Sequence, residues 1–275
     1  MKQKRKLGQI VLAVLLVLGL VFTVVACGKT ESNENVTGNG ETEEVVYTVA
    51  CEPTFPPFEY KDIETDEITG FDIDLIKAIA EESGLKVEIQ GLGFDALTPA
   101  LQAGTIDIIA SGMTIDEERS KQVDFTEPYI NSGLALAVAK TNETIKSEKD
   151  LQGTKVAVQI GTTGAKKANA LKEAGIVKQV KTYDTIDVLM AELAKGTVDA
   201  VINDLPVTQE FIKKGHSEIK IVGEPMDSEQ YGFAVAKGKT ELLQKLNDGL
   251  EKVMESGKYA ELLEKYALPE NAWPK

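Results

Sequence analysis

The sequence contains few of the side chains that bind metals or act as nucleophiles. It has two cysteines, Cys27 and Cys51, and a single histidine, His216, which lies in the polar stretch "KKGHSE". It has no CxxC motif and no pair of histidines. Two cysteines do not make a disulfide framework, and an isolated histidine does not make a metal site or a catalytic triad. We therefore predict no metal, no cofactor and no catalytic residue.

Basic charge is also scarce. The chain has 30 lysine and arginine residues against 44 aspartate and glutamate residues, a formal net charge of −14. Proteins that bind nucleic acid present a basic face, which this balance does not favour, so we predict no nucleic-acid partner. We interpret the excess acid as a source of solubility at the cell surface, and steering of a cationic ligand remains open.

Only one long apolar run is present, and it lies at the N-terminus. The basic stretch "MKQKRK" precedes "IVLAVLLVLGLVFTVVA", which ends immediately before Cys27. This arrangement is typical of a secretory signal peptide, which we assign to residues 1–26. The ending "VVAC" resembles a bacterial lipoprotein cleavage site, so Cys27 is expected to carry lipid. An uncleaved anchor is the alternative, because the run is nearly long enough to span a bilayer. Either way, the protein would be held at the outer face of the cell membrane.

Residues 27–44 lack large apolar side chains apart from Val36, and they are rich in Gly, Ser, Thr, Asn and Glu. Such a segment cannot bury enough surface to fold, so we predict a flexible tether. The globular part then begins near Val45 and comprises about 230 residues, enough for two lobes.

A unit of helix followed by strand occurs twice in the globular part. One copy is "LQAGTIDIIASG", and the other is "LAKGTVDAVIND". Each follows a helical stretch, has a glycine where the helix would end, and continues into a β-branched run. The positions that the copies share are Leu101 and Leu193, Gly104 and Gly196, Thr105 and Thr197, and Asp107 and Asp199.

The same alternation surrounds both copies. Strand-like stretches such as "VVYTVACE" and "KVAVQIG" alternate with amphipathic ones such as "FDIDLIKAIAEESG". This pattern predicts an α/β fold of two lobes, each a mainly parallel sheet flanked by helices. Parallel sheets bind ligands at the carboxyl ends of their strands. We therefore expect the strand ends of the two lobes to face one another across a cleft that binds a small molecule.

The side chains at these strand ends suit a free α-amino acid. Arg119, the only arginine of the globular part, offers a planar fork of donors for a carboxylate, which lysine cannot match. Asp204 can accept a hydrogen bond from an ammonium group. The "GTTG" stretch at 161–164 opens a helix, so its N–H groups with the hydroxyls of Thr162 and Thr163 would form a second anion contact.

Other residues at the strand ends complete this hypothesis. Ser111, Thr114 and the backbone near Gly112 could form an anion-binding nest around the carboxylate. Phe55 and Phe94 follow strands and could cover an aliphatic or planar group.

Each of these residues also has a structural interpretation. Arg119 could form a surface ion pair with a neighbouring glutamate, and Asp204 could cap the helix that follows it. Phe55 and Phe94 could belong to the core, and many Gly-Thr turns bind nothing.

From about Val45 to Leu268 the chain resembles the extracellular solute-binding proteins of bacterial ABC importers, in particular the polar amino-acid group of glutamine-, histidine- and arginine-binding proteins. The stretches that carry the resemblance are "FPPFEY", "GFDIDLIKAIAEESG", "FDALTPALQAGTIDIIASGMTIDEER", "VDFTEPYI", "VAVQIGTTG" and "DAVINDLPV". It implies two α/β lobes joined by two hinge strands, near "SGLALAV" and "SEQYGFAV", that close on the ligand. Lobe 1 would comprise 45–134 and 230–275, and lobe 2 would comprise 135–229.

The resemblance also implies roles for individual residues. Arg119 would bind the α-carboxylate with help from Thr114 and Thr163, while Asp204 and the segment 111–112 would hold the α-amino group. The ligand would lie between two aromatic rings, with two further residues near its side chain. Those four residues are Phe55, Phe94, Glu52 and Gln159.

One pair departs from the pattern of the glutamine-specific members, which have aspartate and lysine where this chain has Glu52 and Gln159. A buried Glu52 would have no built-in cation and would favour a ligand that brings positive charge. Arginine, lysine or histidine is therefore expected ahead of glutamine. Glu52 pointing to solvent is the alternative.

The resemblance thus implies a lipid-anchored, monomeric protein that captures an amino acid for the permease and ATPase of an ABC importer. Two alternatives use the same fold. A dehydratase of a cyclic acid would replace the ammonium acceptor by general acids, and a sensor domain would precede a signalling region.

Overall fold

The computed structural model describes residues 45–269 and residue 272, which form three β-sheets. The predicted signal peptide, Cys27 and the tether lie outside the described residues. The first sheet has the order β5 (Lys86–Gly91), β1 (Val46–Cys51), β6 (Ile108–Ile109), β13 (Ala234–Ala236) and β7 (Val123–Phe125). The second has the order β10 (Gln179–Tyr183), β9 (Lys155–Gln159), β11 (Ala200–Asp204), β8 (Ile130–Ala139) and β12 (Ile219–Tyr231). A small third sheet comprises β2 (Thr54–Phe55), β3 (Glu59–Lys61) and β4 (Ile68–Thr69).

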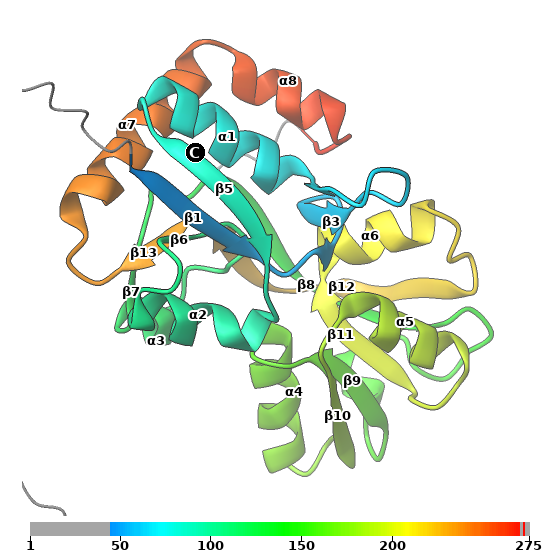
Figure 1. The fold of residues 1–275 in the computed structure, drawn as a ribbon. Coiled ribbons are helices and arrows are strands. Elements are labelled where there is room, and N and C mark those ends of the chain that lie inside the picture. Colours follow the sequence, from blue (N-terminus) through cyan, green and yellow to red (C-terminus); the bar gives the residue numbers. More distant parts are fainter. Residues whose placement is uncertain (1–44, 270–271, 273–275) are drawn as a thin grey trace, which may run out of the picture. The chain divides into compact units, whose positions relative to one another are not determined.

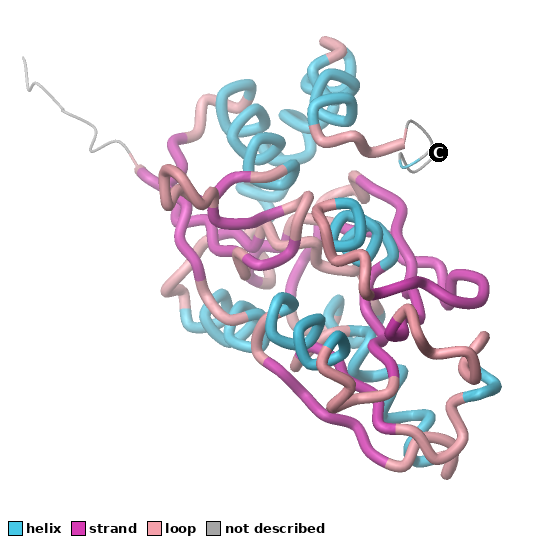
Figure 2. The backbone as a smooth tube through the Cα atoms, turned by 90° about the vertical axis from the view of Figure 1, so that its right-hand side faces the viewer, coloured by secondary structure: helices cyan, strands magenta, loops and turns pink. Residues whose placement is uncertain are grey.

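Helices flank the strands in both lobes (Figures 1 and 2). We call the part built on the first sheet the first lobe and the part built on the second sheet the second lobe. The helices of the first lobe are α1 (Phe71–Glu82), α2 (Phe94–Ala103), α3 (Glu117–Ser120), α7 (Thr240–Glu255) and α8 (Lys258–Lys265). Those of the second lobe are α4 (Thr163–Glu173), α5 (Ile186–Ala194) and α6 (Leu205–Lys213), with a short 3₁₀ turn at Glu148–Asp150. Within the described residues, no helix combines the length and the apolar character needed to cross a bilayer.

The predicted two-lobed α/β fold is confirmed, and each sheet is mixed. In the first sheet β1 is parallel to β5 and β6, whereas β13 is antiparallel to β6 and β7. In the second sheet β9 is parallel to β10 and β11, whereas β8 is antiparallel to β11 and β12. The antiparallel pairings involve β8, which carries the chain into the second lobe, and β13, which follows the return of the chain to the first lobe. The parallel core of each sheet is the part that the strand–helix–strand pattern predicts.

Two strands, β8 and β12, join the lobes (Figure 1). They pair in antiparallel register up to Ile130 and Tyr231, where both reach the first lobe. The loop after β6 is attached to this point, because Thr114 forms a β-bridge with Tyr231 and the Ile115 N–H donates to the Gln230 carbonyl at 2.8 Å. The connecting strands are thus held directly beside a strand end of the first lobe.

The repeated sequence unit makes the same hydrogen bonds in both lobes. The Asp107 carboxylate accepts from the backbone N–H of Thr48 at 2.9 Å, and the Asp199 carboxylate accepts from that of Lys155 at 2.7 Å. In return, the Asp107 N–H donates to the Thr48 carbonyl and the Asp199 N–H to the Lys155 carbonyl, both at 2.9 Å. The aspartates therefore align the strands of their units with β1 in the first lobe and with β9 in the second.

The turn before each aspartate is conserved between the copies as well. Gly104 and Gly196 end their helices with φ of 70° and 73°, a conformation that glycine adopts without strain. Thr105 and Thr197 then donate their hydroxyls to carbonyls in the preceding helix, each at 3.0 Å. The shared residues are thus those that turn a helix into a parallel strand.

Alternating apolar residues build a core on both faces of the second sheet. One face packs against α4, and the other packs against α5 and α6, as the period of two in a strand requires. Leu134, Leu136 and Val138 of β8 belong to the α4 side, whereas Ala137 of the same strand belongs to the other. The strands are therefore buried on both faces, which explains their continuous apolar runs.

The first lobe is packed in the same way between α2 on one face and α1 with α7 on the other. The predicted inner face of α1 is confirmed, since Phe71, Leu75, Ile76 and Ile79 are fully buried. Close contact of α7 with α1 depends on Gly249, where an added Cβ would lie 2.7 Å from the Ile79 carbonyl oxygen.

Candidate functional site

Nine of the eleven predicted ligand-binding residues line a single small cavity. They are Phe55, Phe94, Gly112, Thr114, Arg119, Gln159, Thr162, Thr163 and Asp204. They come from both lobes, because the first five precede β8 and the last four lie on the second sheet and its helices. The other two, Glu52 and Ser111, are buried beside this group.

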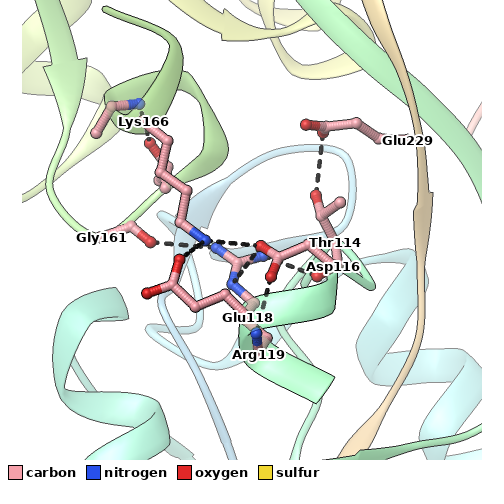
Figure 3. Close-up of polar contacts among 9 residues, drawn as sticks. Thr114, Asp116, Glu118, Arg119, Gly161, Lys166 and Glu229 are labelled. Atoms are coloured by element: carbon pink, nitrogen blue, oxygen red, sulfur yellow. Dashed lines mark hydrogen bonds and ion pairs between the residues drawn. The ribbon is translucent and has the colours of Figure 1, made fainter. Parts of the chain in front are cut away.

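Arg119 is buried, with an exposed fraction of 7 %, although it lies on the short helix α3. Its backbone N–H is held by the capping side chain of Asp116 at 2.8 Å. The interpretation as a surface ion pair is wrong, since Glu117 pairs with Lys121 and Glu118 pairs with Lys166. Figure 3 shows the Arg119 side chain extending to Gly161 of the second lobe.

Hydrogen bonds to two carbonyl groups orient the guanidinium group of Arg119. Nη1 donates to the Thr114 carbonyl at 2.9 Å, and Nη2 donates to the Gly161 carbonyl at 3.1 Å. The Phe94 ring lies below the group, with its centroid 5.3 Å from Cζ. Each terminal nitrogen has two N–H bonds, so each retains a second donor after these contacts. The remaining pair of donors can bind a carboxylate with two parallel hydrogen bonds.

Asp204 provides the opposite charge of the cavity. It ends β11 and stands at the N-cap position of α6, but its side chain makes no capping hydrogen bond. The proposed capping role is therefore wrong. Asp204 instead accepts from the Tyr231 hydroxyl, which in turn accepts from Ser132 at 2.8 Å. Burial and the neighbouring Glu229 raise the pKa of Asp204.

The second predicted anion contact lies at the start of α4, but the Thr162 hydroxyl is not available for it. Thr162 caps the helix, since its hydroxyl accepts from the Ala165 N–H at 3.1 Å and donates to the Gln159 carbonyl at 2.8 Å. Its hydroxyl proton is therefore used within the second lobe. Gly164 lets the helix start approach β11, because an added Cβ would lie 2.9 Å from the Ile202 carbonyl oxygen. Thr163, the first residue of α4, lines the cavity.

Glu52 and Gln159 meet between the lobes. Glu52 is 3 % exposed, so the alternative that it points to solvent is wrong. Its carboxylate accepts from Gln159 Nε2 at 3.0 Å and from the Thr54 hydroxyl at 2.8 and 2.9 Å. Within residues 45–269, no lysine, arginine or histidine forms an ion pair with Glu52. Burial is the largest cause that raises its pKa.

Ser111 and Gly112 belong to a buried support beneath the cavity. The Ser111 hydroxyl accepts from the Glu52 N–H at 2.9 Å and donates to Glu59 at 3.0 Å. The Gly112 N–H donates to Asp72 at 2.8 Å. These groups are already used, so the segment can offer a ligand its backbone carbonyls. Gly112 must be glycine, because it has φ of 47° and an added Cβ would lie 2.6 Å from the Phe55 ring.

The two aromatic residues have different surroundings. Phe55 is 7 % exposed and packs near Phe58 and Tyr231, with ring centroids 6.0 and 6.5 Å apart. It therefore belongs to the core and lines the cavity at the same time. Phe94 is half-buried at the start of α2 and contacts Arg119.

Contacts between the lobes enclose the cavity. Lys166 of α4 forms ion pairs with Asp116 at 2.9 Å and Glu118 at 2.8 Å (Figure 3). On the side of Glu52, the Ile186 N–H of the second lobe donates to the Thr54 hydroxyl at 3.1 Å.

Four buried polar residues of this region were not predicted from the sequence. They are Glu59, Asp72, Glu229 and Tyr231. Glu229 and Tyr231 are two positions apart on a strand predicted to join the lobes, so a period of two already placed them on one face. Asp72 gave no comparable signal, because an acid in the first turn of a helix is usually an exposed partner of the helix dipole.

A family profile and an individual relative identify the same kind of protein. The profile described as "Bacterial extracellular solute-binding proteins, family 3" matches residues 47–269. A probable histidine-binding protein of Campylobacter jejuni is 32 % identical over 246 residues, which cover 89 % of this chain and 93 % of that protein.

Solved structures agree with this result. An ancestral arginine-binding protein bound to arginine is 46 % identical, with a TM-score of 0.76 over 80 % of this chain and 97 % of that one. An ancestral arginine-binding protein bound to glutamine is 45 % identical, with the same TM-score over 82 % and 98 % of the two chains.

The buried Asp72 leads to a prediction about pH. Asp72 accepts from Gly112 and from the Tyr129 hydroxyl, yet burial raises its pKa from 3.8 to about 6. The folded protein therefore holds this proton more tightly than the unfolded chain does. The stabilising contribution is complete below pH 3.8 and is lost as pH rises through about 6. The loss amounts to at most about 3 kcal/mol in the free energy of unfolding.

Asp72→Asn keeps an acceptor for Gly112 but removes the buried charge. We expect its urea unfolding, measured from pH 4 to pH 7, to lack this loss, so that the variant gains stability relative to the parent as pH rises. Asp248→Asn, at an exposed site on α7, should follow the parent. A constant difference between Asp72→Asn and the parent across this range would contradict the assignment.

Proposed function

Because the chain belongs to the bacterial extracellular solute-binding proteins of family 3, we propose that it captures a free L-amino acid with a cationic side chain. It would deliver this ligand to the permease and ATPase of an ABC importer. Arginine, lysine and histidine are the preferred candidates, with glutamine as the comparator.

The observation that carries this proposal is the pair of opposite buried charges in one small cavity. Arg119 and Asp204 both line the cavity, and both are at least nine-tenths buried. An α-amino acid is a zwitterion whose carboxylate and ammonium groups match these two charges. Arg119 would bind the carboxylate with its remaining N–H donors, helped by the backbone at the start of α4. Asp204 would accept from the ammonium group.

The preference for a cationic side chain comes from Glu52. Its carboxylate has neutral hydrogen-bond partners and lies beside Gln159 of the cavity. A guanidinium, ammonium or imidazolium group would supply the missing positive charge. Some of the matched proteins are described as binding histidine or arginine, whereas another, from Escherichia coli, is named for L-cystine. The arginine-binding protein that was solved with glutamine is the reason to test glutamine alongside them.

The buried acids support binding rather than a dehydratase. Catalysis would require a protonated acid in contact with the substrate. Glu59 and Asp72 have raised pKa values, but they do not line the cavity and instead hold Ser111 and Gly112. Asp204 also has a raised pKa and does line the cavity, but the resemblance to binding proteins makes it the acceptor for the α-amino group, which a dehydratase would have replaced.

The attachment to the cell is a further part of the proposal. The signal peptide would be cleaved after residue 26, Cys27 would carry lipid, and residues 27–44 would tether the lobes to the outer face of the membrane. We retain 45–134 with 230–275 and 135–229 as the proposed lobe boundaries, and a monomer as the proposed state.

Substitution of Arg119 tests the carboxylate site. Arg119→Lys keeps the charge but loses the fork, so Kd for the best amino acid of a screen should rise at least about tenfold. Arg119→Ala should raise it further, because the carboxylate would be buried without a counter-charge. Isothermal titration calorimetry measures both. The exposed Lys121→Ala on the same segment should bind as the parent does, and an unchanged Kd in Arg119→Ala would refute the proposed site.

Substitution of Glu52 tests the side-chain preference. Glu52→Gln removes the charge and keeps the size, so Kd for L-arginine should rise about tenfold relative to Kd for L-glutamine. The ratio of the two constants is the quantity to measure. Glu67→Gln, at an exposed position, is the matched control. If the ratio in Glu52→Gln stays within about twofold of the parent, Glu52 does not select the ligand.

Substitution of Cys27 tests the anchor. Cys27→Ser removes the atom that would carry lipid, so the protein should appear in the medium or accumulate as an unprocessed precursor. Cell fractionation with detection of the protein by size distinguishes these forms from the parent. Retention of a mature-size Cys27→Ser protein in the membrane fraction would show that the anchor is elsewhere.

A further inference from the structure

Glu229 is a buried carboxyl group on one of the two strands that join the lobes. It is 7 % exposed and lies opposite Ser132 of β8. The Thr114 hydroxyl donates to Glu229 Oε2 at 3.0 Å, and Figure 3 shows the two side chains pointing toward one another. Thr163 of α4 lowers the pKa of the same carboxyl group. Glu229 therefore holds the hydroxyl of a threonine of the first lobe and interacts with a threonine of the second.

Both threonines line the cavity, whereas Glu229 does not. Glu229 can therefore affect a bound molecule by changing the direction in which a threonine hydroxyl group points. Thr114 is fixed in position by its β-bridge to Tyr231, and Thr163 is fixed as the first residue of α4. The orientation of each O–H bond is the property that Glu229 can change.

A hydroxyl group has one proton, so it can donate to only one acceptor at a time. An ionised Glu229 accepts and cannot donate, which turns the threonine protons toward it and away from the cavity. A protonated Glu229 has an O–H of its own and can donate to a threonine oxygen. The threonine proton is then available to an anion beside Arg119.

The groups around Glu229 make a change of protonation feasible. Burial is the largest cause that raises its pKa, and Asp227 on the same strand raises it further, while Arg119 of α3 lowers it. Asp227 is in turn close to Lys167 of α4, at 3.6 Å. Asp204 of β11 and Glu229 disfavour each other's charge, and Tyr231 lies beside both. The carboxylate of a bound amino acid would add negative charge beside Arg119, while its ammonium group would lie at Asp204.

We propose that Glu229 is a positioning residue that takes up a proton when the ligand's α-carboxylate binds, so that the Thr114 hydroxyl donates to the ligand. This inference rests on the proposed function. The proton comes from the solvent and bonds to a carboxylate oxygen of Glu229. The new O–H of Glu229 donates to the Thr114 oxygen, the Thr114 hydroxyl donates to the ligand in place of Glu229, and no other bond changes. Capture of the amino acid is thereby coupled to protonation at the strands that join the lobes.

Infrared difference spectroscopy of the globular protein, with and without saturating L-arginine at pH 7, tests the coupling directly. The parent should gain the carbonyl stretch of one protonated carboxylic acid, up to one group per bound arginine, and the band should shift in D2O. Glu229→Gln should lack this band while still binding arginine, because its amide can donate to one threonine and accept from the other. Glu224→Gln, an exposed change on the same strand, should show the band of the parent.

The outcomes separate this inference from the proposed function. If the parent binds L-arginine and gains no acid band, the inference is overturned and the binding function stands, even without a folded variant. A band that persists unchanged in Glu229→Gln also overturns it, because another group would then be protonated. If calorimetry shows that the parent binds none of arginine, lysine, histidine or glutamine, the proposed function fails and this inference fails with it.

Discussion

Five carboxyl groups and one guanidinium group are buried in the described part of the chain. They are Glu52, Glu59, Asp72, Asp204, Glu229 and Arg119. A buried carboxylate is unfavourable unless hydrogen bonds or an opposite charge compensate it. Here each accepts from a hydroxyl or an amide, and burial is the largest cause of the raised pKa of every one. Among these groups, Glu52 is the one that we propose favours a ligand with a cationic side chain.

The buried acids connect the residues beneath the cavity with the residues that line it. Asp72 and Glu59 do not line the cavity, but they hold Gly112 and Ser111 in place. One oxygen of each acid, Glu59 Oε2 and Asp72 Oδ1, has no hydrogen-bond partner among the described residues. The strand end that faces the cavity is therefore held by two buried acids. Protonation of either acid would reduce the unfavourable burial of negative charge.

The joining strands β8 and β12 take part in the same network. Ser132, Glu229 and Tyr231 lie on these strands, and they connect with Asp204 and Thr114. A change in the angle between the lobes would alter these hydrogen bonds together with the ion pairs of Lys166. Closure of the lobes on a ligand, which the resemblance implies, would therefore depend on the same few side chains that surround the cavity.

Much of the fold could be predicted because its signals are local. The glycine, threonine and aspartate of the repeated unit end a helix and align a strand, and they make equivalent hydrogen bonds in both lobes. The inner face of α1 follows from its period of 3.6. The antiparallel pairing of β8 and β13 could not be predicted from the sequence. It depends on where the chain passes from one lobe to the other, and no local pattern shows this.

The sequence by itself determined the two α/β lobes, the strand ends and the charge types gathered there, since periodicity and chain order depend on neighbouring residues. It also singled out Arg119, the one arginine of the globular part, and Asp204, an acid at the end of a strand. Only the tertiary structure decided which polar groups were already used. Thr162 and Ser111 have their hydroxyl protons committed, whereas Glu52 meets only neutral partners. Hydrogen-bond saturation depends on atoms brought together from distant parts of the chain, and no local pattern contains that information.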